Sequence, residues 1–234
     1  MLEQYDLSNL MVLDIETVPQ YSSHDQVPEH MHELWAHKIR NNRGEITAED
    51  FYERAGIWAE FGKIVCISVG IFLNGKRAGL RIKSFAGHDE KELLHDFSKM
   101  LSGQPLSLIL CAHNGKEFDF PYICRRMLIN GVPFPPHLQI TGKKPWEIPH
   151  LDTMELWKFG DYKNYTSLSL LTAIFDIPTS KDDIDGSEVG YVYWVEDDLP
   201  RICTYCQKDV IATAQLIRRY RGESLIADDC ITVV

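Results

Sequence analysis

The order of hydrophobic and polar residues predicts strands in the first half of the chain. Short apolar runs, the second of them rich in β-branched residues, cover residues 9–15, 63–73, 79–87 and 106–114. An Asn-Gly pair at 74–75 separates the second run from the third and predicts a hairpin with antiparallel strands. The run at 106–114 is almost entirely apolar, as expected of a central strand that is covered on both faces.

Apolar residues at helical spacing predict helices in most of the remaining chain. The helical segments are residues 29–39, 47–61, 89–102, 117–131, 165–175 and 198–222. Thr47 and Pro200 suit the first turn of a helix, and Gly131 suits a helix end. The order of these elements predicts an α/β fold in which helices flank a mixed sheet, with the first three strands antiparallel.

Composition is that of a folded protein. The chain has 234 residues, of which 44% are hydrophobic and 25% charged. We expect a single domain over residues 1–234, with a helical insertion near residues 20–60 and a poorly fixed tail at 223–234. No apolar run approaches ~18 residues, so no membrane span is expected.

Charge and cysteine content narrow the function classes. A net charge of −10 argues against non-specific binding to nucleic acid, which relies on a basic surface, but allows an enzyme that carries cations at an acidic site. The cysteines lie mostly in apolar runs and no secretory signal precedes them, which favours reduced thiols in a cytoplasmic protein. Cys203 and Cys206 form a C-x-x-C pair, but a zinc site is disfavoured because no second such pair or suitable histidine pair lies nearby.

Four acidic residues lie where buried elements end. Asp14 and Glu16 leave the first apolar run, and they share one face of a strand because they are two positions apart. Asp119 follows the run at 106–114, and Asp209 lies on the last predicted helix. Unpaired carboxylates in one place repel each other, and divalent cations such as Mg²⁺ or Mn²⁺ remove that cost. Two such ions ~4 Å apart are the usual device for in-line displacement at a phosphodiester.

Two further positions add to this pattern. Tyr205 precedes Asp209 by four residues, so both side chains share one face of a helix. Asn114 precedes Asp119 by five residues, and the aromatic Phe118 is next to the acid. A tyrosine hydroxyl in this position can orient a water molecule for attack.

These residues form motifs that resemble a known family. The strings "DIET" at 14–17, "NGKEFD" at 114–119 and "YCQKD" at 205–209 resemble the three exonuclease motifs of the DEDD superfamily, and Tyr-x-x-x-Asp resembles its DEDDy branch. The segments "HLDTMELW", "SLSLLTAIFDIP" and "KDDIDGSEV" are similar to predicted 3′–5′ exonucleases related to the proofreading domain of family B DNA polymerases. The resemblance covers about residues 10–220.

The resemblance implies a ribonuclease H-like fold and a metal-dependent 3′–5′ exonuclease that releases nucleoside 5′-monophosphates from single-stranded nucleic acid, DNA in preference to RNA. By matching positions, Asp14 would bind both of two divalent cations, Mg²⁺ or Mn²⁺. Glu16 and Asp209 would hold the ion beside the attacking water, which Tyr205 would position. Asp119 would hold the second ion, beside the leaving oxygen.

Residues for the nucleic acid are expected close to these motifs. They are Thr17, Asn114, Phe118, Lys181 and Ser187. Basic residues at 125–126, 143–144 and 218–221 either meet phosphate or form solvated faces. Since no polymerase-like sequence follows within these 234 residues, we expect any polymerase or repair partner to act in trans.

Several alternatives stay open at this point. Asp152 either caps a helix that begins at Thr153 or lies behind the metals. The acidic net charge also suits a phosphodiesterase that acts on small dinucleotides, and a catalytically silent nucleic-acid-binding module of the same fold is a further candidate. The sequence leaves the oligomeric state, the preferred metal and the pathway open.

Overall fold

The structure is a computed structural model of the chain, and it describes residues 2–74, 78–161, 163, 165–178 and 183–234. Within these residues the strands form one mixed sheet of order β5-β4-β1-β2-β3-β6. β1 pairs antiparallel with β2 and parallel with β4, and β2 pairs antiparallel with β3. The strands are β1 (Leu10–Pro19), β2 (Gly62–Leu73), β3 (Gly79–Ala86), β4 (Ile109–Ala112), β5 (Leu151–Asp152) and β6 (Ile231–Val233).

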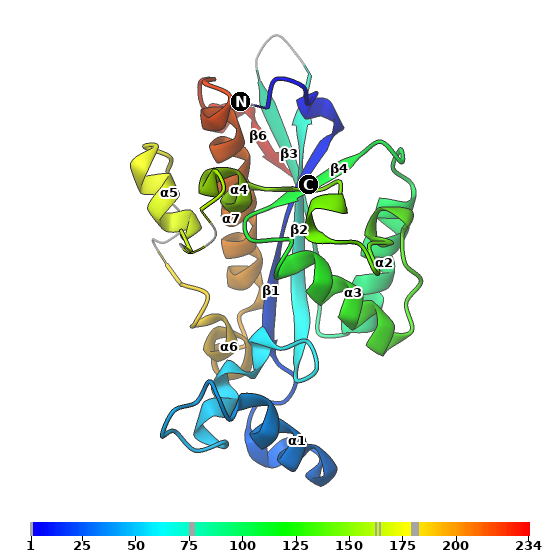
Figure 1. Cartoon of the computed structure of the whole chain (residues 1–234), viewed down its shortest axis with the longest axis vertical. Coiled ribbons are helices and arrows are strands. Elements are labelled where there is room, and N and C mark those ends of the chain that lie inside the picture. The colour runs from blue at the N-terminus through cyan, green and yellow to red at the C-terminus, as the bar shows by residue number, and fades with distance from the viewer. Residues whose placement is uncertain (1, 75–77, 162, 164, 179–182) are drawn as a thin grey trace.

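Helices cover both faces of the sheet, and α7 lies on the face opposite α2 and α3 (Figure 1). The α-helices are α1 (Glu29–Ile39), α2 (Glu90–Ser102), α3 (Asp119–Asn130), α4 (Thr153–Lys158), α5 (Leu168–Ile174), α6 (Val189–Tyr191) and α7 (Leu199–Tyr220). This arrangement confirms the predicted α/β fold with a mixed sheet and three antiparallel first strands. Among the described helices, none is both long and apolar enough to cross a membrane.

The central strand β1 is buried on both faces because its residues alternate between two cores. Met11 and Leu13 pack with α2 and α3, whereas Leu10 and Val12 pack under α7. The period of two therefore assigns every even position of β1, including the two acidic ones, to the α7 side.

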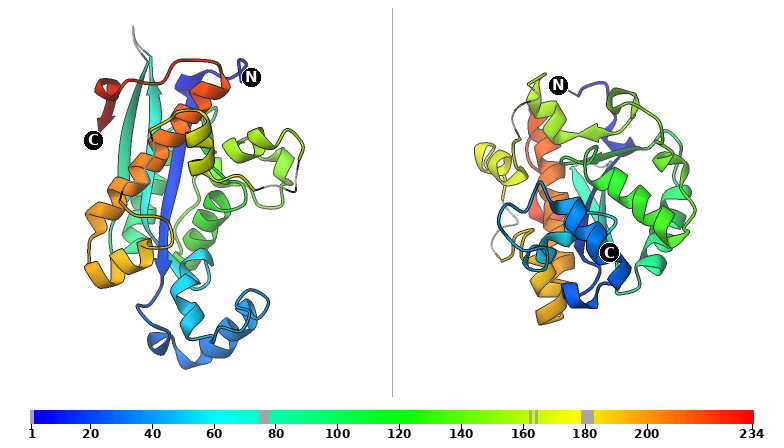
Figure 2. Two further views of the ribbon diagram at one scale, coloured as in Figure 1. Left: turned by 90° about the vertical axis from the view of Figure 1, so that its left-hand side faces the viewer. Right: turned by 60° about the horizontal axis from the view of Figure 1, so that its bottom comes forward.

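The long helix α7 crosses the sheet diagonally (Figure 2, left). Its close approach depends on Gly70 of β2, where a Cβ atom would lie 2.7 Å from the Val210 side chain. At the N-terminus of α7, Asp198 accepts a hydrogen bond from the N–H of Arg201 at 3.1 Å. Pro200, in the first turn as predicted, has no N–H that would need a partner there.

The segment between β1 and β2 forms a lobe at one end of the sheet (Figures 1 and 2). It contains α1 and, instead of the predicted α-helix over 47–61, a 3₁₀ helix at Asp50–Ile57. Its N-cap is Glu49 and not the predicted Thr47, although the Thr47 hydroxyl accepts a hydrogen bond from the Asp50 N–H at 3.1 Å. The Tyr122 hydroxyl of α3 donates to the Gly56 carbonyl at 2.7 Å and ties the lobe to the body.

One prediction about the second half of the chain is wrong. The end of the chain is not a loose tail, because Leu80, Arg81 and Ile82 of β3 pair in parallel with β6. The strand β5 was not predicted, because two residues are too short to show a period. The helix α4 begins at Thr153, as one of the two alternatives for Asp152 required. Residues 75–77 of the predicted hairpin turn lie outside the described residues.

Candidate active site

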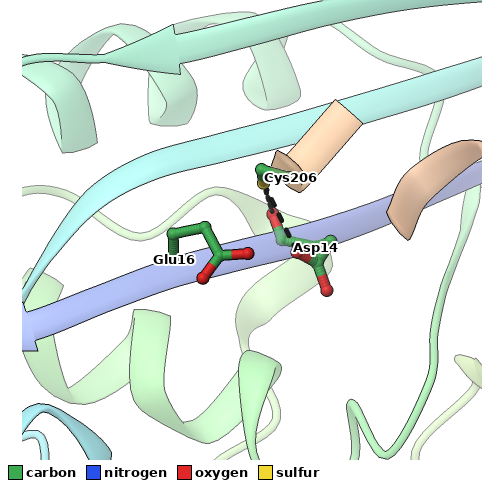
Figure 3. Close-up of side chains that lie close together, drawn as sticks. All are labelled: Asp14, Glu16 and Cys206. Atoms are coloured by element: carbon green, nitrogen blue, oxygen red, sulfur yellow. Dashed lines mark hydrogen bonds between the residues drawn. The ribbon is translucent and has the colours of Figure 1, made fainter. Parts of the chain in front are cut away.

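The side chains of Asp14 and Glu16 lie on the face of β1 that α7 covers. Asp14 is partly buried and Glu16 is almost fully buried. They pair across the ladder with Ser68 and Cys66 of β2, and the register shifts at a bulge between Glu16 and Thr17. Bulges bend a strand and re-aim its side chains, and they are common beside active sites. The Glu16 carboxylate points toward Asp14 (Figure 3).

Asp119 reaches the same place from the other side of the sheet. After β4 the chain turns at Asn114, whose φ of 63° is left-handed, and α3 begins at Asp119. The Asp119 carboxylate is 4% exposed and accepts a hydrogen bond from the backbone of Ile15, the residue between the two acids of β1. The turn therefore docks the third carboxylate directly onto β1.

Asp209 and Tyr205 come from α7, one turn apart. The Tyr205 hydroxyl hydrogen-bonds to the Asp209 carboxylate. Burial raises the pKa of Tyr205, and the neighbouring charges of Asp209, Glu16 and Asp14 raise it further. The phenol therefore stays protonated over the physiological pH range and acts as a hydrogen-bond donor.

The four carboxylates act on one another. Burial raises the pKa of Asp14 first, and the charges of Glu16, Asp209 and Asp119 add to it. Burial likewise dominates the raised pKa of Glu16, and Asp209 and Asp119 follow. The pKa of Asp119 rises to about 7, again chiefly through burial. Four acids from three elements thus act on one another, in surroundings that penalise their ionised form.

Cys206 is a neighbour that sequence reasoning did not place in the site. Its Sγ lies 3.4 Å from Asp14 Oδ2, and the ligand atoms of Asp14, Glu16 and Cys206 all lie within 4.8 Å of one another (Figure 3). The signal was present in the spacing, since Cys206 precedes Asp209 by three residues and so shares its helix face.

This donor set fits divalent cations. Carboxylate oxygens are the ligands that Mg²⁺ and Mn²⁺ prefer, and a bound cation offsets both the repulsion and the desolvation of these acids. Asp14, Glu16, Asp119 and Asp209 are the residues that could hold such ions.

Asp152 supports the site from behind. Its carboxylate caps α4, which was one of the two alternatives for this residue. The same carboxylate also fixes the turn after β4. It accepts hydrogen bonds from the N–H groups of Met154, Glu155, Asn114 and Lys116. Its charge also helps to raise the pKa of Asp119, so Asp152 acts on the acidic cluster as well as capping α4.

A cleft of about 870 Å³ opens beside the carboxylates. It is bounded by β1, by the turn before α3, by the 3₁₀ helix of the lobe and by the segment before α6. Its lining includes Asp14, Glu16, Thr17, Ile46, Asp50, Glu53, Ile57, Asn114, Phe118, Asp119, Tyr165 and Ser187. Four of the five residues expected to contact nucleic acid thus line one cleft, and the fifth, Lys181, lies outside the described residues.

Most of the basic residues singled out in the sequence have structural partners. Arg126 is 3% exposed and paired with Glu90, so it is not on the surface. Arg218 and Arg221 pair with Glu223 near the end of α7. Lys144 lies over the exposed ring of Trp146, 5.2 Å from its centroid.

Comparisons with known proteins agree with this geometry. A family B DNA polymerase from the hyperthermophilic archaeon Pyrobaculum calidifontis is one of the solved structures that match, with a TM-score of 0.56 and 14% sequence identity. The match covers 90% of this chain and 24% of the polymerase, so the chain spans about a quarter of that protein's length. At this identity the likeness shows the fold. No curated protein gives a significant match.

A family model identifies the chain more specifically. Residues 57–224 match the model described as a predicted 3′–5′ exonuclease related to the exonuclease domain of PolB. The match spans Asp119, Tyr205 and Asp209, whereas Asp14 and Glu16 precede it. The predicted resemblance to this family is thereby confirmed, and the chain belongs to the predicted 3′–5′ exonucleases related to the PolB exonuclease domain.

Proposed function

We propose that this protein is a metal-dependent 3′–5′ exonuclease that removes nucleoside 5′-monophosphates from single-stranded nucleic acid. The observation that carries the proposal is the convergence of Asp14, Glu16, Asp119 and Asp209 beside a cleft. When bound, a pair of Mg²⁺ or Mn²⁺ ions makes a water acidic enough to attack near neutral pH and neutralises charge on the leaving oxygen.

The protein's own residues provide position and charge. The other three carboxylates all act on Asp14, and by its position in the first motif it is the residue proposed to hold both ions. Glu16 and Asp209 would hold the ion that activates the attacking water, and Asp119 would hold the other. Because these side chains are fixed by a strand and two helices, little reorganisation is needed when the substrate arrives.

Tyr205 orients the attacking water in this proposal. Its hydroxyl is protonated and lies beside Asp209, so it can donate a hydrogen bond while a neighbouring carboxylate accepts one. Removal of the hydroxyl would leave the carboxylates in place but would release the water from its attack position.

The cleft suits the end of a single strand. Its volume lies in the range of pockets that enclose a small ligand, which is enough for a terminal nucleotide but not for a duplex. Ile57 and Tyr165 are 54% and 69% exposed and offer apolar surface on which a base can stack. Among the described residues, buried Asn114 Oδ1 has no hydrogen-bond partner, and it suits a donor such as the terminal 3′-hydroxyl.

A phosphodiesterase that acts on small dinucleotides is the second candidate. Asp50 and Glu53 line the cleft beside the catalytic acids, and the net charge of the chain is −10. Both features repel the extended phosphate backbone of a long strand. A catalytically silent binding module of the same fold is the third outcome to be tested.

The experiment uses oligonucleotides of DNA and RNA that carry a label at either end, together with dinucleotides. With Mg²⁺ or Mn²⁺, the 5′-labelled strand is expected to shorten stepwise and the 3′-labelled strand to release a labelled mononucleotide, faster for DNA than for RNA. A chelator is expected to stop both reactions. Cleavage of dinucleotides alone would favour the second candidate, and binding without cleavage at any metal concentration would contradict the exonuclease proposal.

A further inference from the structure

The active-site cluster contains sulfur as well as oxygen. Cys206 is fully buried, and its thiol lies 3.4 Å from both the backbone oxygen and the side-chain Oδ2 of Asp14. A site built only for Mg²⁺ has no need of a thiol, because hard cations bind oxygen. The mixed donor set is therefore a feature that the proposed nuclease chemistry does not use.

Cys66 extends this sulfur face. It is the cross-strand partner of Glu16 on β2, so both side chains lie on the α7 side of the sheet. It is fully buried, and it belongs to the same apolar cluster as Cys206 and the partly buried Cys203 of the C-x-x-C pair. Of these thiols, that of Cys206 lies with the ligand atoms of Asp14 and Glu16.

The spacing of the donors matches a tetrahedral ion. With Zn–S bonds of about 2.3 Å and Zn–O bonds of about 2.0 Å, a tetrahedral Zn²⁺ holds sulfur and oxygen about 3.5 Å apart. The Cys206 Sγ and Asp14 Oδ2 atoms are 3.4 Å apart, and the Glu16 carboxylate lies within the same 4.8 Å group. These side chains would need only small rotations to share one ion.

We propose that Asp14, Glu16 and Cys206 bind one thiophilic divalent cation, Zn²⁺ or Cd²⁺, and that this ion excludes Mg²⁺ and Mn²⁺. Each coordinating thiol releases its proton to the solvent when the ion binds. An ion held by these three side chains occupies Asp14, which the catalytic ions also need. The site would therefore sense a soft metal and switch the enzyme off.

The order of affinities supports this exclusion. A given N/O/S site binds Zn²⁺ more tightly than Mn²⁺, and thiolate ligands widen that difference. Asp14 is the residue proposed to hold both catalytic ions, so an ion that recruits it toward Cys206 competes for the centre of the cluster. Only this inhibitory consequence rests on the proposed nuclease function, whereas the binding itself does not.

Cobalt spectroscopy tests the site directly. Co²⁺, which replaces Zn²⁺ in tetrahedral sites, gives a near-ultraviolet charge-transfer band when a thiolate binds it. We expect this band when the full chain is titrated with Co²⁺ under a phosphine reductant, and we expect one equivalent of Zn²⁺ to remove it. Cys206→Ser should lose the band, whereas Cys124→Ser should keep it, because Cys124 packs with α2 and α3 on the other face of the sheet.

A second readout uses inhibition by Zn²⁺. The Zn²⁺ concentration that halves Mg²⁺-dependent digestion, measured against each variant's own uninhibited rate, should rise at least about tenfold in Cys206→Ser and stay unchanged in Cys124→Ser. If Cys206→Ser does not fold, Asp14→Asn replaces it, and Co²⁺ should then bind at least about tenfold more weakly. A wild-type protein without the band, or a variant of Asp14 or Cys206 that retains it at full affinity, would overturn the proposal.

The two proposals fail separately. A thiolate–Co²⁺ band in a protein that digests no oligonucleotide would leave the metal site standing and remove the nuclease function. Metal-dependent digestion without the band, and without sensitivity to Zn²⁺, would do the reverse.

Discussion

Two groups of buried acids in this molecule have opposite surroundings. Glu90, at the start of α2, is 7% exposed, and so is Glu16 in the cleft. Glu90 is surrounded by donors: Arg126 binds it through two nitrogens at 2.8 and 2.5 Å, and the Ile64 N–H and Asn130 side chain complete its partners at 2.7 and 2.9 Å. Glu16 instead faces Asp14, Asp119 and Asp209.

The difference separates a structural acid from a functional one. The Glu90 pair joins α2, α3 and β2, because Ile64 of β2 donates to Glu90. Arg126 also donates to the carbonyl of Ala59, just before β2, at 2.7 Å. Partners within the chain therefore offset the desolvation free energy of the buried Glu90 carboxylate. At Asp14 and Glu16 that cost is left for a ligand to offset, which reduces the stability of the metal-free fold in favour of function.

Replacement of Asp14 by Asn should give the largest effect. The amide keeps the shape but removes the charge at the centre of the cluster, so we expect digestion to fall by roughly 10³-fold or more. A labelled-oligonucleotide assay measures this fall, with Glu117→Gln as the control because that exposed carboxylate lies in the second motif, two residues before Asp119. Equal rates for Asp14→Asn and the parent would remove Asp14 from the mechanism.

The opposite behaviour is expected at the structural pair. Arg126→Met leaves Glu90 buried without its charged partner, which should lower the free energy of unfolding by about 3–5 kcal/mol. The double variant Glu90→Leu/Arg126→Met should recover more than half of that loss. Urea denaturation gives these values, and a single variant within about 1 kcal/mol of the parent would contradict the comparison.

The Tyr205 hydroxyl should matter less than a carboxylate. Tyr205→Phe retains the ring, which is 8% exposed, and every metal ligand, so we expect turnover to fall about 10–100-fold with metal affinity retained. Turnover under saturating metal, together with a Mn²⁺ binding isotherm, distinguishes the two quantities. Unchanged turnover would mean that the tyrosine serves only to pack α7.

The metal-free protein should lose stability as pH rises. Unfolded Asp119 ionises near 3.8, whereas burial holds its folded pKa at about 7. The folded state therefore binds the extra proton between these values, and the free energy of unfolding falls as pH increases through the interval. Asp119→Asn should lack this contribution, so the difference between parent and variant isolates it. Melting temperatures from pH 4 to 8 in chelator test this sign, and a gap that is constant with pH would contradict it.

Much of this contrast could be predicted from the sequence. The period of two in β1 places Asp14 and Glu16 on one face, and the four-residue spacing places Tyr205 beside Asp209. By contrast, Glu90 and Arg126 are 36 residues apart, and in the sequence each looks like an ordinary surface charge. Local periodicity carries no information on which distant charges meet.

The environment of the site was harder to predict for the same reason. Ile46 and Ile57 belong to the lobe between β1 and β2, and only its docking through Tyr122 brings them to the cleft. Cys206 looked inert, because a zinc site was sought in a second cysteine pair rather than in carboxylates from another element. The strand β6 was missed because three residues show too little alternation.

Thermal unfolding with and without Mn²⁺ at pH 8 tests the central claim most directly, since it asks whether the acids of the cleft are held against their own repulsion. In chelator, Asp14→Asn should be as stable as the parent or more stable, by about 0.5–2 kcal/mol. Mn²⁺ should raise the melting temperature of the parent and leave that of the variant nearly unchanged. A variant that is less stable than the parent in chelator, and is stabilised equally by Mn²⁺, would contradict the account.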